Sequence, residues 1–241
     1  MGIATERRTG VANGASSADA APPDGSPGTI ARQLEFDILF GALRPRERLV
    51  EDVLMQRFGA TRHAVRQALV ELERMEIVTR APNRGAAVRD FDAQEVEEIT
   101  ELRETLHRRA VQRMRLPAGA KLIGQLKAIQ RRHDKAVAAR DPRAIDDANE
   151  AFHEALFGAC DNRLLAKAIG HYAYLSRAMR LYPLVDPLLL QTLRSEHWAM
   201  IEAIEAGNRP LLSRLVVDHI QHSKRLYLQV RAAPAKVAAK A

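Results

Sequence analysis

The chain has 241 residues, of which 46% are hydrophobic and 5% aromatic, so it is long enough for two domains with apolar cores and its composition favours helices. Its net charge of +7 points to nucleic acid or another polyanion as a partner. A single cysteine excludes a disulfide framework and a cysteine-based zinc finger within the chain, and no apolar run reaches the roughly 18 residues of a membrane span. Near the N-terminus we find no apolar stretch typical of a secretory signal, and we expect a cytoplasmic protein.

Residues 1–28 are rich in Ala, Ser, Pro and Gly and are predicted to form a disordered tail. Apolar residues at helical spacing predict a first helix at 29–41. Residues 43–50 are expected to connect it to a short helix at 51–58. That helix should bury Val53, Leu54 and Phe58 and end at Gly59, because glycine tolerates the left-handed conformation that often follows a helix.

Residues 61–76 are predicted to form the second helix of a helix-turn-helix. Thr61 can cap this helix, its hydroxyl accepting from a backbone N–H two or three residues on. One side of the helix carries an apolar stripe formed by Val65, Ala68, Leu69 and Leu72. Long polar side chains project from roughly the opposite side, near the helix start: Arg62, His63, Arg66 and Gln67. The second helix of such a motif is the one that enters the major groove of DNA.

Two short β-prone runs, at 77–80 and 86–89, flank a turn that contains Pro82, Asn83 and Gly85. They predict a β-hairpin wing with Arg84 at its tip. Between residues 57 and 89, seven arginines stand against three glutamates. Such a surplus of positive charge suits a phosphate backbone.

From residue 91 onward no strand pattern recurs, and the breaks are typical of helices. Asp92 and Glu95 form a capping box, while Asp141-Pro142 and Asp186-Pro187 each place a cap residue before proline at the first helical position. About six helices are expected, near 92–115, 118–139, 142–159, 162–181, 187–206 and 209–231. The predicted fold class is mainly α. It comprises a winged helix-turn-helix with a small β-hairpin wing at 29–90, an all-α helical bundle at 91–232 and a short tail at 233–241.

In four of the predicted helices a polar residue interrupts the apolar stripe that should face the core: Arg103, Asn149, His153, His197 and His219. Burying a polar group without a partner costs on the order of 1–3 kcal/mol, so these groups are expected to meet one another. Three imidazoles and an amide oxygen would suit a divalent metal such as Zn, Ni or Mn. The planar guanidinium of Arg103 would suit a carboxylate bound at that metal. Taken singly, each histidine is more often an ordinary core or surface residue, and His222 is either a spare ligand or faces solvent.

Residues 42–88 resemble the winged helix-turn-helix of the GntR family of bacterial transcription regulators. The resemblance rests on the Arg62-x-x-x-Arg66 pair and on Asn83-Arg84-Gly85 of the wing. His63-Ala64 and Gln67 depart from the Thr-Pro and Glu that are usual in the family. The resemblance implies that the following residues contact DNA: Thr61, Arg62, His63, Arg66, Gln67, Asn83, Arg84 and Gly85.

Residues 92–232 resemble the all-helical effector domain, the FCD domain, of the FadR-like branch of that family. The resemblance rests on Asn149-Glu-Ala-Phe-His153, on Glu196-His197 and on Asp218-His219-Ile220. It implies that Asn149, His153, His197 and His219 hold a metal ion, with Asn149 where many members have Asp. It also implies that Arg103 meets the carboxylate of an effector, commonly a small organic acid or a sugar acid.

These features predict a ligand-responsive transcription regulator, expected to act as a repressor. Two recognition helices that read successive major grooves require a pseudo-palindromic operator, so we expect a homodimer on double-stranded DNA. Effector and metal would shift the helical bundle and so change the spacing of the two winged domains. Two alternatives stay open. One is a regulator that responds to the metal itself, with no organic effector. The other is a metal-dependent enzyme, which the absence of a His-Glu-x-x-His pattern argues against.

Overall fold

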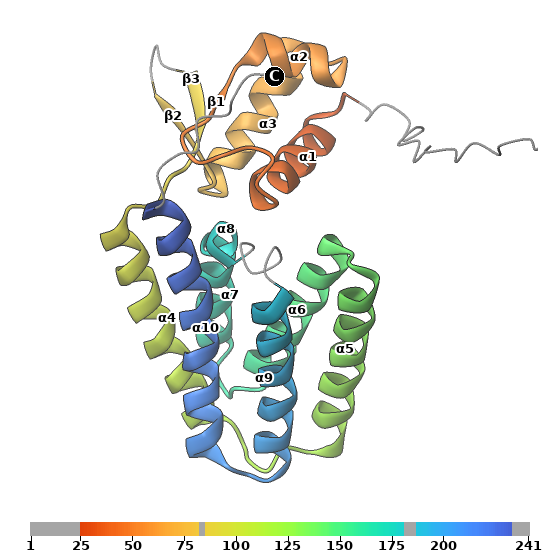
Figure 1. Ribbon diagram of the computed structural model, residues 1–241, viewed down its shortest axis with the longest axis vertical. Coiled ribbons are helices and arrows are strands. Elements are labelled where there is room, and N and C mark those ends of the chain that lie inside the picture. Colours follow the sequence, from red (N-terminus) through yellow and green to blue (C-terminus); the bar gives the residue numbers. More distant parts are fainter. Residues whose placement is uncertain (1–24, 82–84, 181–186, 233–241) are drawn as a thin grey trace, which may run out of the picture.

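The computed structural model describes residues 25–81, 85–180 and 187–232. It has two parts, a small N-terminal part of three helices and a three-stranded sheet, and a larger part built from helices alone (Figure 1). The mainly α fold class predicted from the sequence is confirmed. Among the described residues every helix is too short or too polar to cross a lipid bilayer. The predicted terminal tails lie largely outside the described residues.

The N-terminal part is held together by an apolar core that its helices and strands share. Its helices are α1 (Pro27–Leu39), α2 (Glu51–Phe58) and α3 (Arg62–Arg74). Helix α1 begins two residues before the predicted start, because the Ser26 hydroxyl accepts from the backbone N–H of Thr29 and Pro27 occupies the first turn. The buried side chains of this core include Ile30, Leu34, Leu54, Phe58, Val65, Leu69 and Leu72.

The turn between α2 and α3 forms as its sequence predicts. Gly59 follows α2 in the left-handed conformation, with φ of 57°, and the Thr61 hydroxyl accepts from the Ala64 backbone N–H at 3.2 Å. Leu54 and Phe58, four residues apart, are the buried side of α2. The prediction for Val53 is wrong: its side chain is 59% exposed, because it lies about 100° around the helix from Leu54.

The sheet has the strand order β1-β3-β2 and is antiparallel throughout. Strands β2 (Val78–Ala81) and β3 (Gly85–Val88) form the predicted wing. Strand β1 (Arg48–Leu49) adds to the other side of β3, with Arg48 opposite Ala87. This segment was predicted to be a connector, because two residues are too few to show the alternation typical of a strand.

The C-terminal part consists of helices that run roughly side by side (Figure 1). They are α4 (Ala93–Arg113), α5 (Ala120–Ala139), α6 (Pro142–Gly158), α7 (Arg163–Leu175), α8 (Arg177–Arg180), α9 (Pro187–Glu205) and α10 (Arg209–Ala232). Helix α10 packs against α4 and α9, and α5 packs against α6 and α9. Asp92 and Asp141 cap α4 and α6 as predicted.

The single helix predicted at 162–181 is wrong, since the structure divides it into α7 and α8 at Ser176. The Ser176 hydroxyl donates to the carbonyl oxygens of Tyr172 and Ala173, at 2.8 and 3.2 Å. A hydroxyl that bonds to the preceding turn in this way competes with regular helix hydrogen bonding. The break places α8 at the end of the helical part that faces α1 (Figure 1).

Candidate functional site

The predicted recognition helix, α3, presents its polar side chains to solvent. Thr61, Arg62, His63, Arg66 and Gln67 are all exposed, whereas the apolar stripe of α3 is buried. Because Thr61 caps the helix, its first backbone N–H groups are held in place at the end that carries the arginines. The arrangement is that of a helix free to enter a groove by its N-terminal half.

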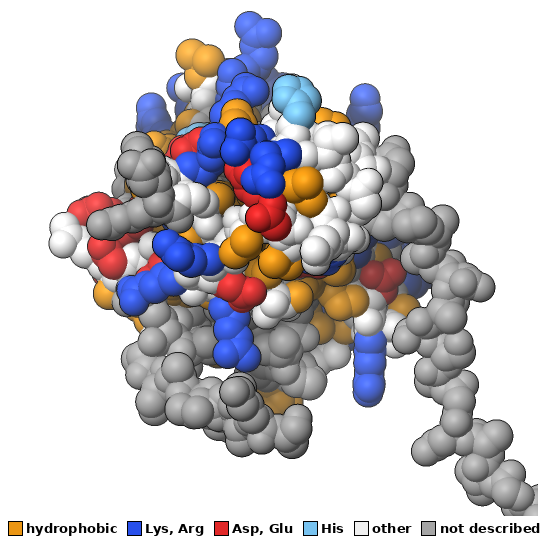
Figure 2. Space-filling model, turned by 90° about the horizontal axis from the view of Figure 1, so that it is seen from above, with side chains coloured by type: hydrophobic (Ala, Val, Ile, Leu, Met, Phe, Trp, Pro, Cys, Tyr) orange, Lys and Arg blue, Asp and Glu red, His pale blue; other side chains and the backbone are white. Residues whose placement is uncertain are grey.

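Acidic residues of α2 lie against the arginines of α3. Arg62 contacts Glu51 at 3.2 Å and Asp52 at 2.6 Å, and Arg66 contacts Glu51 at 2.9 Å. The hydrogen bond from Arg66 is the main reason that the pKa of Glu51 lies below its ordinary value. Glu51 and Asp52 precede residue 57, so the count of arginines and glutamates between residues 57 and 89 did not include them. Figure 2, which looks onto this end of the molecule, shows acidic side chains among the basic ones. Exposed ion pairs of this kind are each worth about 0–1 kcal/mol.

The wing is described only at its strands. Gly85 begins β3, is exposed and has φ of 74°, a left-handed conformation that glycine adopts without strain. Asn83 and Arg84, predicted to contact DNA at the tip, lie outside the described residues.

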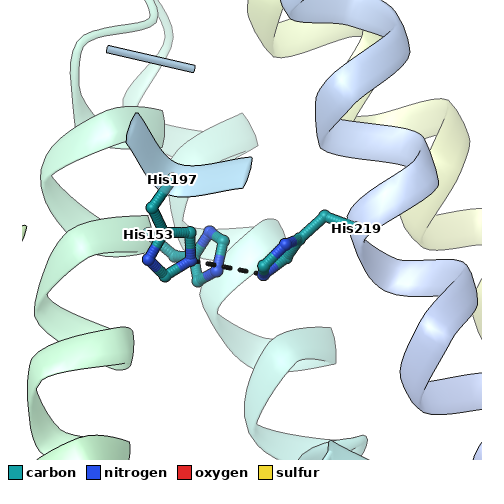
Figure 3. A group of neighbouring side chains, drawn as sticks. All are labelled: His153, His197 and His219. Carbon is teal, nitrogen blue, oxygen red and sulfur yellow. Dashed lines mark hydrogen bonds between the residues drawn. The ribbon is translucent and has the colours of Figure 1, made fainter. Parts of the chain in front are cut away.

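Three histidines from three helices meet inside the helical part (Figure 3). His153 is on α6, His197 on α9 and His219 on α10, and one ligand atom from each lies within 4.8 Å of those of the other two. His197 is fully buried and His219 is 7% exposed. These imidazoles were predicted to converge, and the structure brings all three together.

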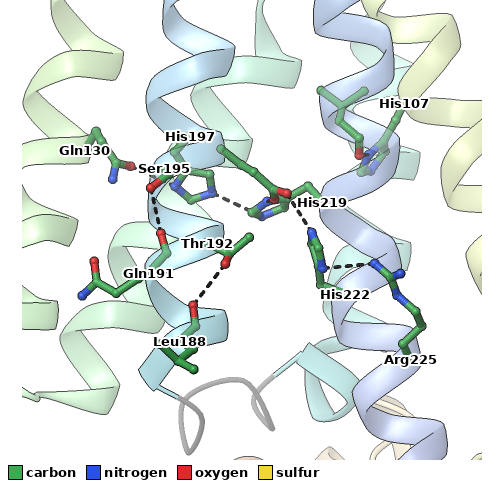
Figure 4. Close-up of polar contacts among 12 residues, drawn as sticks. His107, Gln130, Leu188, Gln191, Thr192, Ser195, His197, His219, His222 and Arg225 are labelled. Carbon is green, nitrogen blue, oxygen red and sulfur yellow. Dashed lines mark hydrogen bonds and ion pairs between the residues drawn. The ribbon is translucent and has the colours of Figure 1, made fainter.

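Two further polar residues orient the histidine rings (Figure 4). His197 Nδ1 lies 2.8 Å from Oε1 of Gln130, on α5, and His219 Nδ1 lies 2.7 Å from Oε2 of Glu196, on α9. Since an amide or carboxylate oxygen only accepts, each ring donates from Nδ1. The lone pair of a neutral ring is then on Nε2. Hydrogen bonds of this kind are common behind metal-bound histidines.

The two Nε2 atoms, of His197 and His219, face each other at 3.3 Å. Burial is the main cause of the lowered pKa of both imidazoles, which keeps them neutral near pH 7. Two nitrogens bound to one tetrahedral zinc ion at about 2.0–2.1 Å would themselves be about 3.3 Å apart. The spacing and the inward lone pairs therefore fit a divalent metal ion, which would accept both.

Asn149 and Arg103, the other predicted members of the site, come from α6 and α4. Asn149 is half-buried one helical turn before His153. Arg103 is 7% exposed. Burial is the main cause of the lowered pKa of His219, and the positive charge of Arg103 contributes to lowering it.

Two residues near the histidines, Gln130 and His133, were not predicted from the sequence, and Glu196 was named only as the neighbour of His197 in the resemblance to the FCD domain. His133 is 2% exposed, its ring centroid is 5.4 Å from that of His197, and burial lowers its pKa to about 4. Gln130 and His133 lie in the apolar stripe of α5 with Leu126 and Ile129, the same signal that was used for the other helices.

His222 does not simply face solvent, because its side chain is half-buried and its Nε2 lies 2.7 Å from Oε1 of Glu196. Glu196 thus contacts two histidines, one with each oxygen. A carboxylate therefore lies beside the histidine cluster, although the sequence contains no His-Glu-x-x-His pattern. Glu196 and His222 also line a pocket of about 470 Å³, whose remaining walls are Asp218, Gln221 and Arg225. Glu196 therefore lies between the histidine cluster and this pocket.

A winged helix-turn-helix joined to a helical domain with a buried polar cluster is typical of a DNA-binding regulator with a separate sensing domain. Comparison with known proteins agrees. The sequence model for bacterial regulatory proteins of the gntR family matches residues 28–88, and that for the FCD domain matches residues 98–222. The chain therefore belongs to the GntR family of bacterial transcription regulators, in the branch that carries an FCD effector domain.

The curated relatives include YdhC, an HTH-type transcriptional regulator of Bacillus subtilis (strain 168), 26% identical over 79% of this chain and 85% of that protein. Two solved structures share the fold. A GntR-type transcriptional regulator from Rhodococcus sp. RHA1 has a TM-score of 0.68 at 20% identity, covering 86% of this chain and 99% of that one. McbR/YncC of E. coli has a TM-score of 0.65 at 18% identity, covering 85% and 98%. The GntR family and YdhC are transcription regulators and not enzymes, so the enzyme alternative is set aside.

Proposed function

We propose that the protein is a homodimeric repressor whose FCD domain binds a divalent metal ion together with a small carboxylate effector. The observation that carries the proposal is the cluster of His153, His197 and His219, with Nδ1 of two rings engaged and their Nε2 atoms turned inward. Neutral imidazole suits Zn or Ni, and an amide oxygen such as that of Asn149 would suit Mn. When bound, such an ion would supply a fixed positive charge with positions open to a ligand.

Arg103 is the residue that favours an organic acid over the metal alone as the signal. Its guanidinium is buried, and its charge acts on His219. Arginine can donate two parallel hydrogen bonds to a carboxylate, which fits an acid held between it and the metal. Asn149 is proposed as a further ligand through its amide oxygen, since it lies one helical turn from His153.

The DNA-binding half of the proposal rests on α3 and the wing. Arg62 and Arg66 would reach base edges or phosphates in the major groove, with Thr61, His63 and Gln67 beside them. Asn83, Arg84 and Gly85 would follow the wing along the DNA. A homodimer would place two such helices about one helical turn apart on a pseudo-palindromic operator in the bacterial cytoplasm.

A thermal-shift panel of small carboxylic acids on zinc-loaded protein tests the site. A ligand at 100 times its dissociation constant stabilises by about 2.7 kcal/mol, which gives a shift of several degrees. The shift should be lost in His153→Ala and in Arg103→Ala. The shift should persist in Arg109→Ala, a matched control for Arg103→Ala that lies on the exposed face of α4.

Each outcome of the panel has a definite meaning. A shift by an acid that survives in both site variants would overturn the assignment of the effector site. If zinc raises the melting temperature and changes DNA affinity while every acid is silent, the protein is a metal-responsive regulator with no organic effector. If zinc itself binds no tighter to the native protein than to His153→Ala, the metal proposal fails.

A further inference from the structure

A buried arginine joins the helical domain to the DNA-binding domain. Arg177, in α8, has a side chain only 15% exposed, and its Nη1 donates to Oε1 of Glu35, in α1, at 2.9 Å. The same Glu35 oxygen accepts from the Tyr174 hydroxyl at 3.0 Å. Glu35 is itself only 15% exposed, so this contact is largely shielded from water and salt.

The other partners of Arg177 are carboxylates of α6. Nε of Arg177 donates to Oδ2 of Asp146 at 2.8 Å and lies 3.3 Å from Oε1 of Glu150. The Asp146 side chain is 2% exposed. Burial alone would lower the pKa of Arg177, but Asp146, Glu150 and Glu35 raise it, so the guanidinium stays charged at the centre of three carboxylates.

Helix α6 is also the helix of His153. Asp146, Asn149, Glu150 and His153 recur at spacings of three and four residues and so share one face. At 1.5 Å per residue, Asp146 and His153 are about 10 Å apart along one stiff helix. Two carboxylate partners of Arg177 and two of the proposed metal ligands are thus on the same rigid helix.

Helix α6 also contacts α1 directly, at the N-terminal turn of α6, in addition to the indirect link through Arg177 of α8. The Arg143 guanidinium lies over the ring of Phe36, 4.7 Å from its centroid. This cation–π contact and the Arg177–Glu35 ion pair both connect α6 to α1, whose buried face packs on the recognition helix α3.

We propose that Arg177 is a positioning residue through which occupancy of the three-histidine site sets the orientation of the DNA-binding domain. The inference rests on the proposed function, because it requires a metal ion at His153. A bound ion restrains α6, α6 places Asp146 and Glu150, and these hold Arg177, which in turn holds Glu35 of α1. By linkage, metal and DNA then alter each other's affinity through these contacts.

The variant Glu35→Gln tests this chain of contacts. It keeps the size of the side chain and leaves Asp146 and Glu150 to neutralise Arg177, so folding is preserved. The matched control is Lys127→Gln, which breaks an ion pair of 2.6 Å with Glu205 inside the helical domain. All three proteins are titrated with zinc by calorimetry. Their affinity for one duplex, selected from a random library by the native protein, is then measured with zinc and with chelator.

Zinc should change DNA affinity by about fivefold or more in the native protein and in Lys127→Gln, but less than about twofold in Glu35→Gln. Zinc affinity itself should be equal in all three. Amide hydrogen exchange supplies a readout without DNA: zinc should slow exchange in α1 of the native protein and not in Glu35→Gln.

The failure of the two proposals can be told apart. If calorimetry finds no zinc site in the native protein, the proposed function fails and the inference fails with it. If zinc binds but changes DNA affinity and α1 exchange equally in the native protein and in Glu35→Gln, the metal site stands and the role of Arg177 is overturned. If zinc binds the native protein and changes neither quantity, the role of Arg177 is overturned as well.

Discussion

Glu51, in the first turn of α2, accepts from Nε of Arg66, in α3, with its two oxygens at 2.9 and 3.0 Å. One of these oxygens also accepts from Arg62 at 3.2 Å. Because Glu51 engages Nε, the terminal amino groups of Arg66 are the ones left to reach a base edge. The carboxylate of Glu51, in α2, thus orients both Arg62 and Arg66, in α3.

The substitution Glu51→Gln is expected to weaken sequence discrimination while raising affinity for random DNA. The change removes a negative charge that would lie near the phosphates, and it loosens Arg66, which is proposed to read a base. A bidentate contact to guanine is worth about 1–3 kcal/mol of discrimination, so the ratio of specific to random affinity should fall about tenfold. Competition binding with a selected and a scrambled duplex measures this ratio. Asp52→Asn, which removes a partner of Arg62 alone, should change the ratio less, and an unaltered ratio in Glu51→Gln would refute an orienting role.

At Asn149, replacement by Asp is expected to tighten zinc binding, and replacement by Ala to weaken it. A carboxylate adds a negative charge at the position of a proposed neutral ligand, whereas alanine removes the ligand. Calorimetric titration with zinc compares the two variants with the native protein. The exposed Asp147→Asn, on another face of α6, serves as a control. Equal zinc affinity in all four proteins would show that Asn149 does not contact the metal.

Removing the Glu196 side chain as Glu196→Ala should lower zinc affinity by about 10- to 100-fold, the usual effect of losing a hydrogen bond behind a metal-bound histidine. The reason is that His219 would lose the oxygen that keeps its proton on Nδ1. His222→Ala, which leaves the contact between Glu196 and His219 in place, should bind zinc within a few-fold of the native protein. Comparable losses in both variants would instead assign the effect to the pocket beside Glu196.

Loss of the cap in Thr61→Ala is expected to destabilise the DNA-binding domain by about 1 kcal/mol, whereas Thr61→Ser should be nearly neutral. The Thr61 hydroxyl accepts from the Ala64 N–H, and alanine leaves that donor without its acceptor. Urea unfolding measures the free energy of unfolding of both variants. The assignment is wrong if the serine variant is destabilised as much as the alanine variant.

Local signals were sufficient for the parts of the fold that depend on neighbours in the chain. The end of α2 at Gly59 and the start of α3 at Thr61 follow from backbone freedom and from a hydroxyl three residues from its donor. The break at Ser176 is also local, but a serine inside an apolar helix pattern bonds to the preceding turn only in some contexts, and the pattern alone predicted one continuous helix. Strand β1 was missed because its two residues are ordered by pairing with β3, and not by their own pattern.

The candidate site divides in the same way. That His153, His197 and His219 lie inside the bundle could be predicted, because each interrupts an apolar stripe whose period identifies the buried face. The partners of these histidines could not, since Gln130 and Glu196 reach His197 and His219 from other helices.

The sequence by itself determined the two-part architecture, the recognition helix and the inward position of three histidines, because periodicity and capping act over a few residues. Only the tertiary structure decided which polar groups meet. It joined Glu51 to Arg66, Glu196 to both His219 and His222, and Arg177 to Glu35. The physical reason is that a hydrogen bond or ion pair depends on distance in space, and helix packing sets that distance between residues far apart in the chain.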